Sequence, residues 1–121
     1  MWANHWVGKR YEKAGRGPDA YDCFGLFMDV QQNVFDVFVP DVLGDEYRAA
    51  IELQRANWRQ CEAAIEGDAI LFRIGSRDLH IGVALNNKDM LHAHHTGGVC
   101  VEPWNHILWK KRVLGIFRHD K

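Results

Sequence analysis

The spacing of the hydrophobic residues changes near Gly67, and this change constrains the fold more than any other feature of the chain. Before it, apolar side chains recur every three or four positions, as in Cys23, Leu26, Phe27, Val30 and Val34. After it come short apolar runs, the first of which, residues 69–74, follows the turn signal Gly67-Asp68. The first pattern is typical of amphipathic helices and the second of strands. The sequence therefore predicts an α+β fold, with N-terminal helices packed on an antiparallel sheet of about five strands.

Three helices are expected in the first half of the chain. They are predicted at residues 2–14, from Asp22 to a point before Pro40, and from about Asp45 through Trp58. The strands are predicted at residues 69–74, 80–85, 90–94, 99–102 and 113–118. The first two helices are separated by Gly15-Arg-Gly-Pro-Asp19, whose glycines and proline predict a shaped loop.

Length and composition favour one soluble globular domain over residues 1–121. Hydrophobic residues make up 47% of the chain and charged residues 26%, and the formal net charge is -1. That charge does not indicate a nucleic acid partner. No apolar run approaches the ~20 residues needed for membrane insertion. The N-terminal residues lack an apolar stretch and a cleavage site, so we expect synthesis in the cytoplasm without a secretory signal.

The three cysteines, Cys23, Cys61 and Cys100, form neither a disulfide framework nor a familiar zinc framework, because their number is odd and no C-x-x-C spacing occurs. Cys23 differs from the other two in its position after a glycine- and proline-containing loop, at the predicted start of a helix. Unpaired backbone N–H groups and the helix dipole stabilise a thiolate there. The alternative is a buried packing residue, which is the commoner role of cysteine and the one we expect for Cys61 and Cys100.

Two histidines lie on neighbouring predicted strands. In residues 80–85, alternation places His80 on one face with Gly82, while the other face is apolar. A three-residue loop at residues 86–88 would place His92 opposite Gly82 and diagonal to His80, within reach of its ring. His92 could then orient the His80 imidazole, although a single histidine at a strand end is more often a surface residue.

The run His92-Ala-His-His95 suggests a metal site, but no carboxylate or cysteine completes a tetrahedral set with it at a familiar spacing. We therefore expect no metal and no cofactor. Asp22 is better placed to cap a helix than to act as a catalytic acid.

Four short motifs contain these residues. They are Asp22-Cys-Phe-Gly-Leu26, Gly67-Asp-Ala-Ile-Leu-Phe72, His80-Ile-Gly-Val83 and Leu91-His-Ala93. Tyr11 precedes them and Gly98-Val99 follows, so that they extend over nearly the whole chain. In their order and intervals they resemble the NlpC-type cell-wall peptidases, a branch of the papain-like cysteine peptidases.

The resemblance implies a papain-like fold and a site for each role. Cys23 would be the nucleophile at a helix N-terminus, His80 the base and His92 the residue that orients it. Tyr11 would contact the substrate or help to stabilise the oxyanion. Relatives of this type cleave peptidoglycan stem peptides, typically between γ-D-glutamate and a diamino acid, so a stem peptide is the expected partner.

Phe24 departs from the resemblance, because the nucleophile is commonly followed by serine. The missing hydroxyl removes a potential polar contact to substrate. An aromatic residue at this position is similar to versions carried by phages, which would bring the protein to the cell wall on a virion tail, beside other tail proteins. The alternative is a structural tail component with little or no turnover.

Overall fold

The computed structural model describes residues 1–41, 57–75 and 78–120. Its elements in chain order are the 3-10 helix η1 (Trp2–His5), β1 (Arg10–Tyr11), β2 (Ala20–Tyr21), α1 (Cys23–Val34), β3 (Trp58–Cys61), β4 (Ala69–Ile74), β5 (Asp78–Ala84), β6 (Asp89–His94), β7 (Gly98–Pro103), α3 (Ile107–Lys110) and β8 (Val113–His119). Over these ranges, every helix is too short or too polar to cross a bilayer.

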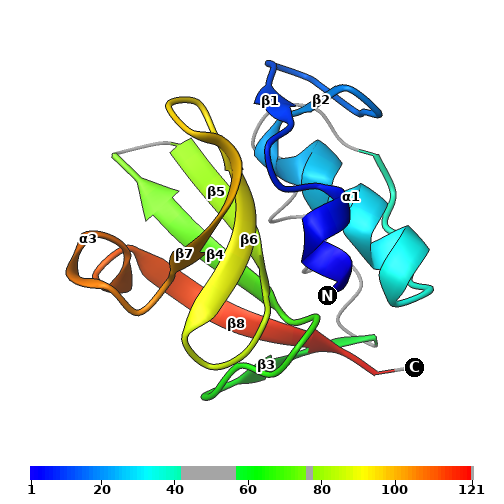
Figure 1. The fold of residues 1–121 in the computed structure, drawn as a ribbon. Coiled ribbons are helices and arrows are strands. Elements are labelled where there is room, and N and C mark those ends of the chain that lie inside the picture. The colour runs from blue at the N-terminus through cyan, green and yellow to red at the C-terminus, as the bar shows by residue number, and fades with distance from the viewer. Residues whose placement is uncertain (42–56, 76–77, 121) are drawn as a thin grey trace.

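The main sheet has six antiparallel strands in the order β3-β8-β4-β5-β6-β7 (Figure 1). The α+β prediction is confirmed, and each of the five predicted strands has its counterpart in β4 to β8. The sixth strand, β3, was not predicted. A separate pair, β1 and β2, is parallel.

Two helix predictions are wrong in part. The only helix described in residues 2–14 is the short η1, because the chain that follows it bonds to β7 and then forms β1. The Gly8 N–H donates to the carbonyl of Val99 at 2.9 Å, and the Val99 N–H donates to the carbonyl of Lys9 at 2.9 Å. Trp58, the expected end of the third helix, lies in β3 opposite His119. The rest of that helix falls outside the described residues.

The second helix begins where the sequence predicts. Asp22 is its N-cap, and its carboxylate accepts from the Gly25 backbone N–H at 2.6 Å. Gly25 is required for a separate reason, since a Cβ at this position would lie 2.0 Å from the carbonyl oxygen of Gly15. The loop before the helix therefore packs directly against its first turn and fixes the position of Cys23.

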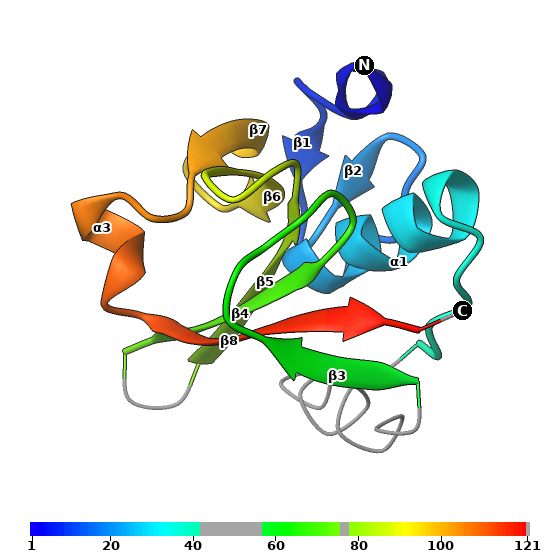
Figure 2. The same cartoon turned by 90° about the horizontal axis from the view of Figure 1, so that it is seen from below.

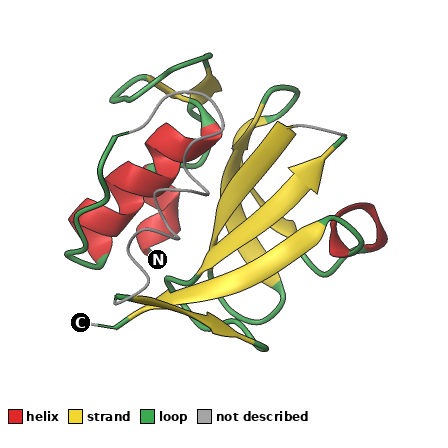
Figure 3. Cartoon of the chain, turned by 180° about the vertical axis from the view of Figure 1, so that it is seen from behind, coloured by secondary structure: helices red, strands yellow, loops and turns green. Residues whose placement is uncertain are grey.

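Alternating side chains of the sheet supply two hydrophobic clusters, one on each face. Leu71, Ile81 and Val83 are buried together with side chains of α1. On the opposite face, Phe72 is buried together with Trp109 of α3. The two helices accordingly lie on opposite sides of the sheet (Figures 2 and 3).

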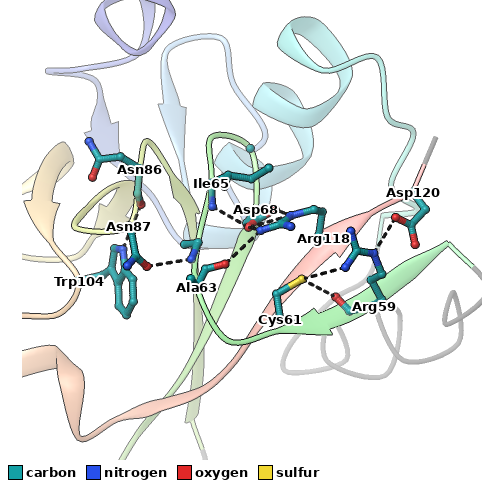
Figure 4. A network of polar contacts seen from close by, with 12 residues as sticks. Arg59, Cys61, Ala63, Ile65, Asp68, Asn86, Asn87, Trp104, Arg118 and Asp120 are labelled. Atoms are coloured by element: carbon teal, nitrogen blue, oxygen red, sulfur yellow. Dashed lines mark hydrogen bonds and ion pairs between the residues drawn. The ribbon is translucent and has the colours of Figure 1, made fainter.

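A buried ion pair holds the turn that leads into β4 (Figure 4). Asp68 is 2% exposed, and both of its carboxylate oxygens accept from the guanidinium of Arg118, with Nη2 and Oδ2 2.8 Å apart. The backbone N–H of Ile65 donates to the same carboxylate at 2.8 Å, and Arg118 also donates to the carbonyl of Ala63. The Gly67-Asp68 turn is thus anchored to β8, the strand next to β4.

Candidate active site

The loop between β5 and β6 sets the positions of the two histidines. Val83 pairs with Leu91 and Ala84 with Met90, so the intervening loop is residues 86–88 and Gly82 lies opposite His92. Asn86 closes the loop, because its side-chain oxygen accepts from the backbone N–H groups of residues 88 and 89, each at 2.8 Å. The prediction that both imidazoles share one face is confirmed.

His80 and His92 are in direct contact. Nε2 of His80 lies 2.8 Å from Nδ1 of His92, and the two residues are 4% and 0% exposed. Gly82 lies beside a packed side chain of the neighbouring strand. A Cβ there would lie 2.9 Å from the sulfur of Met90, so a side chain of the neighbouring strand already occupies the space over the glycine.

Glu102 extends this pair to a third strand, and sequence reasoning missed it. Its Oε2 lies 2.8 Å from Nε2 of His92 and accepts from the indole N–H of Trp109 at 3.1 Å. In the β6–β7 ladder, His92 is opposite Cys100, which places Glu102 on its diagonal. Alternation over residues 99–102 places Cys100 and Glu102 on the same face of their strand. Only the register of the β6–β7 hairpin brings Glu102 next to His92.

Aromatic rings enclose the histidines on the face opposite α1. Trp109 stacks on His80 with centroids 5.4 Å apart and an interplanar angle of 23°, and it meets His92 edge-on at 5.2 Å. Phe72 lies 5.7 Å from His80 on the other neighbouring strand. These contacts remove water from the imidazoles and leave their mutual hydrogen bond in an apolar environment.

Both histidines favour the neutral form. Burial lowers the pKa of His80 well below 6.5, and the nearby imidazoles of His92, His94 and His95 lower it further. Burial also lowers the pKa of His92 to about 4, although the Glu102 carboxylate opposes this change. Burial therefore opposes the preformed thiolate–imidazolium pair that a helix-terminal cysteine suggests, and favours a neutral imidazole that can accept a proton.

Cys23 is the first residue of α1, and its side chain is partly exposed. Tyr11 lies on β1, where burial raises the pKa of its phenol, with further contributions from the negative charges of Cys23 and Asp22. The structure thus brings the predicted nucleophile and Tyr11 into one electrostatic neighbourhood. The starts of α1 and β5 and the end of β6 lie at the same end of the molecule (Figure 1).

Phe24 does not face an open site. It is 2% exposed and lies 6.3 Å from the ring of Phe27, within the cluster between α1 and the sheet. The expected loss of a polar substrate contact at this position stays a prediction. The aromatic ring adds to the packing of the helix that carries Cys23.

The fold brings a cysteine and a carboxylate close to His92, which the spacing in the sequence did not indicate. Cys100 and Glu102, from the adjacent strand, place their donor atoms with that of His92 within 4.8 Å of one another. However, Nε2 of His92 is already hydrogen-bonded to Glu102, and burial, followed by the charge of Glu102, raises the pKa of the Cys100 thiol. A raised thiol pKa opposes the thiolate that a soft metal requires. That the protein uses no metal stays a prediction.

Comparison with known proteins identifies related sequences over most of the chain. Residues 8–118 match the NlpC/P60 family. The protein named murein DD-endopeptidase MepS/murein LD-carboxypeptidase from Escherichia coli (strain K12) is 30% identical over 107 residues, which cover 88% of this chain and 54% of that protein. The chain therefore spans about half the length of this relative.

Solved structures share the architecture. An NlpC/P60 family protein from Bacillus cereus superposes with a TM-score of 0.76 at 19% identity, over 97% of this chain and 37% of that one. The NlpC/p60 domain of the peptidoglycan hydrolase SagA gives a TM-score of 0.69 at 18% identity, over 96% and 92% of the two chains. At these identities the likeness establishes the fold, and it confirms the papain-like architecture.

Proposed function

The chain belongs to the NlpC/P60 family, and from this premise we propose that it is a cysteine peptidase acting on peptidoglycan stem peptides. The observation that carries the proposal is the 2.8 Å contact between two buried imidazoles, at the end of the fold where α1 begins with Cys23. We assign the bond between γ-D-glutamate and a diamino acid as the one cleaved.

In the proposed reaction, Cys23 Sγ attacks the carbonyl carbon of the scissile amide while His80 takes the thiol proton. The resulting imidazolium gives this proton to the amine, which leaves as the carbon–nitrogen bond breaks and a thioester remains. A water molecule then attacks the thioester as His80 removes one of its protons. That proton returns to sulfur, and the peptide is released as a carboxylic acid.

His92 and Tyr11 support these steps. His92 orients the His80 ring through the Nδ1–Nε2 contact. The Tyr11 phenol, whose pKa burial raises further, is protonated near neutral pH and can donate a hydrogen bond. We assign this donor, together with the backbone N–H of Cys23, to the oxyanion that forms on the carbonyl.

Purified muropeptides analysed by mass spectrometry provide the test. We expect new products split between γ-D-glutamate and the diamino acid with the wild type and with Cys61→Ala, but not with Cys23→Ala. Cys61 is the matched control, since it is also a free, partly exposed thiol. Products from a different peptide bond would overturn only the assigned bond. Turnover that survives Cys23→Ala would overturn the cysteine mechanism.

A phage tail remains our proposed location, supported by the aromatic Phe24 in the box Tyr21-Asp-Cys-Phe-Gly-Leu26. A structural tail component with little turnover is the second candidate. The muropeptide assay separates the two, because a peptidase releases products that depend on Cys23, whereas a structural component releases none. Mass spectrometry of purified virions tests the location, which fails if the protein is missing from the particles.

A further inference from the structure

The nitrogen atoms of His80 and His92 can hold their protons in two arrangements, and only one of them leaves His80 with an unprotonated nitrogen outside the pair. In one, His92 accepts at Nδ1 and His80 donates from Nε2, so that a neutral His80 has a lone pair at Nδ1. In the other, His92 donates from Nδ1, and a neutral His80 carries its proton at Nδ1. The second arrangement cannot accept a thiol proton there.

We propose that Glu102 is a positioning residue that selects the first arrangement by fixing the proton of His92 on Nε2. The carboxylate can only accept, and its Oε2 lies 2.8 Å from Nε2 of His92. His92 is 0% exposed, so no water competes for this nitrogen. A neutral His92 with its proton on Nε2 has only a lone pair at Nδ1.

The consequence passes to His80 through their 2.8 Å contact. Because His92 Nδ1 accepts, His80 Nε2 must donate, and the remaining nitrogen of a neutral His80 is a free base. Nδ1 of His80 has no hydrogen-bond partner in the part of the chain that the structure describes. The selection also persists during turnover, since an imidazolium at His80 still donates from Nε2.

The three residues form a diagonal across three strands. His80 on β5 is two residues from Gly82, which lies opposite His92, and Glu102 on β7 is two residues from Cys100, which also lies opposite His92. The indole N–H of Trp109 holds the same carboxylate oxygen at 3.1 Å. Glu102 is thus aimed at His92 by register and by a second donor, although 43% of its side chain is exposed.

Glu102→Ala and Glu102→Gln test this role, with Glu66→Ala as the matched control. Glu66 also accepts an indole N–H, from Trp2 at 2.8 Å, but has no histidine partner among the described residues. The glutamine oxygen can still accept from His92, whereas alanine cannot. We expect Glu102→Ala to lower kcat about 10- to 100-fold with little change in KM, because His92 would then no longer hold His80 in the required tautomer. Glu102→Gln should remain within about threefold of the wild type, and Glu66→Ala should equal it.

The second readout is independent of turnover. Long-range ¹H–¹⁵N correlation spectra distinguish a protonated ring nitrogen from an unprotonated one. We expect His92 to carry its proton on Nε2 in the wild type and in Glu102→Gln, and to show a mixed or reversed tautomer in Glu102→Ala. An unchanged His92 tautomer in Glu102→Ala would overturn the inference, as would an unchanged kcat.

The inference rests on the proposed peptidase function, but the two can fail separately. If the wild type releases no peptide products while the His92 tautomer still follows Glu102, the proposed function fails and the structural coupling stands. If the wild type is active and the tautomer ignores Glu102, the inference alone fails.

Discussion

Two buried polar clusters in this sheet are built alike but have different electrostatics. In each, a buried side chain meets a partly exposed partner of a different strand or turn. Asp68, 2% exposed, meets Arg118, and His92, 0% exposed, meets Glu102. In the first cluster, a buried carboxylate faces a permanent cation. In the second, the buried partner is a neutral imidazole whose pKa burial lowers to about 4.

This difference in electrostatics indicates a structural role for the first cluster and a chemical role for the second. Asp68 receives several hydrogen bonds from Arg118 and one from the backbone of Ile65, and the pair fixes a turn. The histidine chain can exchange protons, because each ring nitrogen changes from donor to acceptor with its tautomer. We therefore expect changes at the first cluster to alter stability, and changes at the second to alter turnover.

The largest effect is expected from His80→Gln. A glutamine amide can still donate to Nδ1 of His92, but it cannot accept a proton from a thiol. Turnover of muropeptides should fall by about 10³-fold or more, since the general base is lost. The urea unfolding midpoint should stay near that of the wild type. A large loss of stability with residual turnover would show instead that His80 has a structural role.

Arg118→Met should have the converse effect. It leaves the Asp68 carboxylate buried without its cation, and removing one partner of such a pair is strongly destabilising. Water reaches the guanidinium, whose side chain is 23% exposed, so we expect a loss below the usual range of about 3–5 kcal/mol, at about 2–3 kcal/mol by urea unfolding. The folded fraction should keep the wild-type kcat.

A double variant is the control for this result. Asp68→Asn combined with Arg118→Met removes the buried charge together with its partner. It should be more stable than Arg118→Met alone, because the uncompensated carboxylate is what costs stability. If the double variant is less stable than the single one, the ion pair itself is not the source of the loss.

The two clusters also differ in how far the sequence predicts them. The shared face of His80 and His92 follows from the strict period of two and a three-residue loop, so it was predictable. Asp22 likewise marks the start of α1 by its capping chemistry. Such features depend on residues close together in the chain, where local geometry leaves few alternatives.

The contacts between distant segments could not be predicted in this way. Glu102 meets His92 only in the register of the β6–β7 hairpin, whose Gly98 has a φ of 66° and would place a Cβ 2.6 Å from the Lys9 carbonyl oxygen. Arg118 reaches Asp68 across 50 positions of sequence. The N-terminal segment has a helical pattern, but its hydrogen bonds to Val99 override local propensity.

Lowering the pH should destabilise the folded protein through the histidine cluster, and this effect lies between the largest and the smallest expected here. The pKa of His92 is about 4 in the folded protein and 6.5 without burial, so between these values the unfolded chain binds a proton that the folded chain does not. Stability should therefore fall as the pH drops from about 6.5 to about 4, by up to ~3 kcal/mol for this group. His80, whose pKa is also lowered, adds to the loss.

Urea unfolding at a series of pH values checks this expectation, with His92→Gln as the control. The variant should show a shallower decline below pH 6.5, since one of the buried titrating groups is gone. Equal slopes in the two proteins would mean that His92 titrates normally, and that the histidine cluster is more hydrated than its burial indicates.

The smallest effect is expected at the exposed ion pair beside the first cluster (Figure 4). Arg59 and Asp120 are 2.9 Å apart, as close as many buried pairs, but their side chains are 55% and 49% exposed. Solvent weakens the attraction, and ordering two mobile side chains offsets much of what remains. Asp120→Asn should therefore leave the urea midpoint within the error of the measurement at ordinary ionic strength.

Salt separates the two kinds of pair. Raising the ionic strength from 0.1 M to 1 M shortens the screening length from about 10 Å to about 3 Å, which removes what little the exposed pair contributes. The wild type and Asp120→Asn should then coincide, while Arg118→Met should remain less stable than both, since salt does not enter the space around Asp68. If the Arg118→Met deficit also disappears in 1 M salt, Asp68 is solvated, and burial does not distinguish the two pairs. The distance between the charges would then determine the strength of both ion pairs. The histidine cluster would differ from them only in its ability to exchange protons.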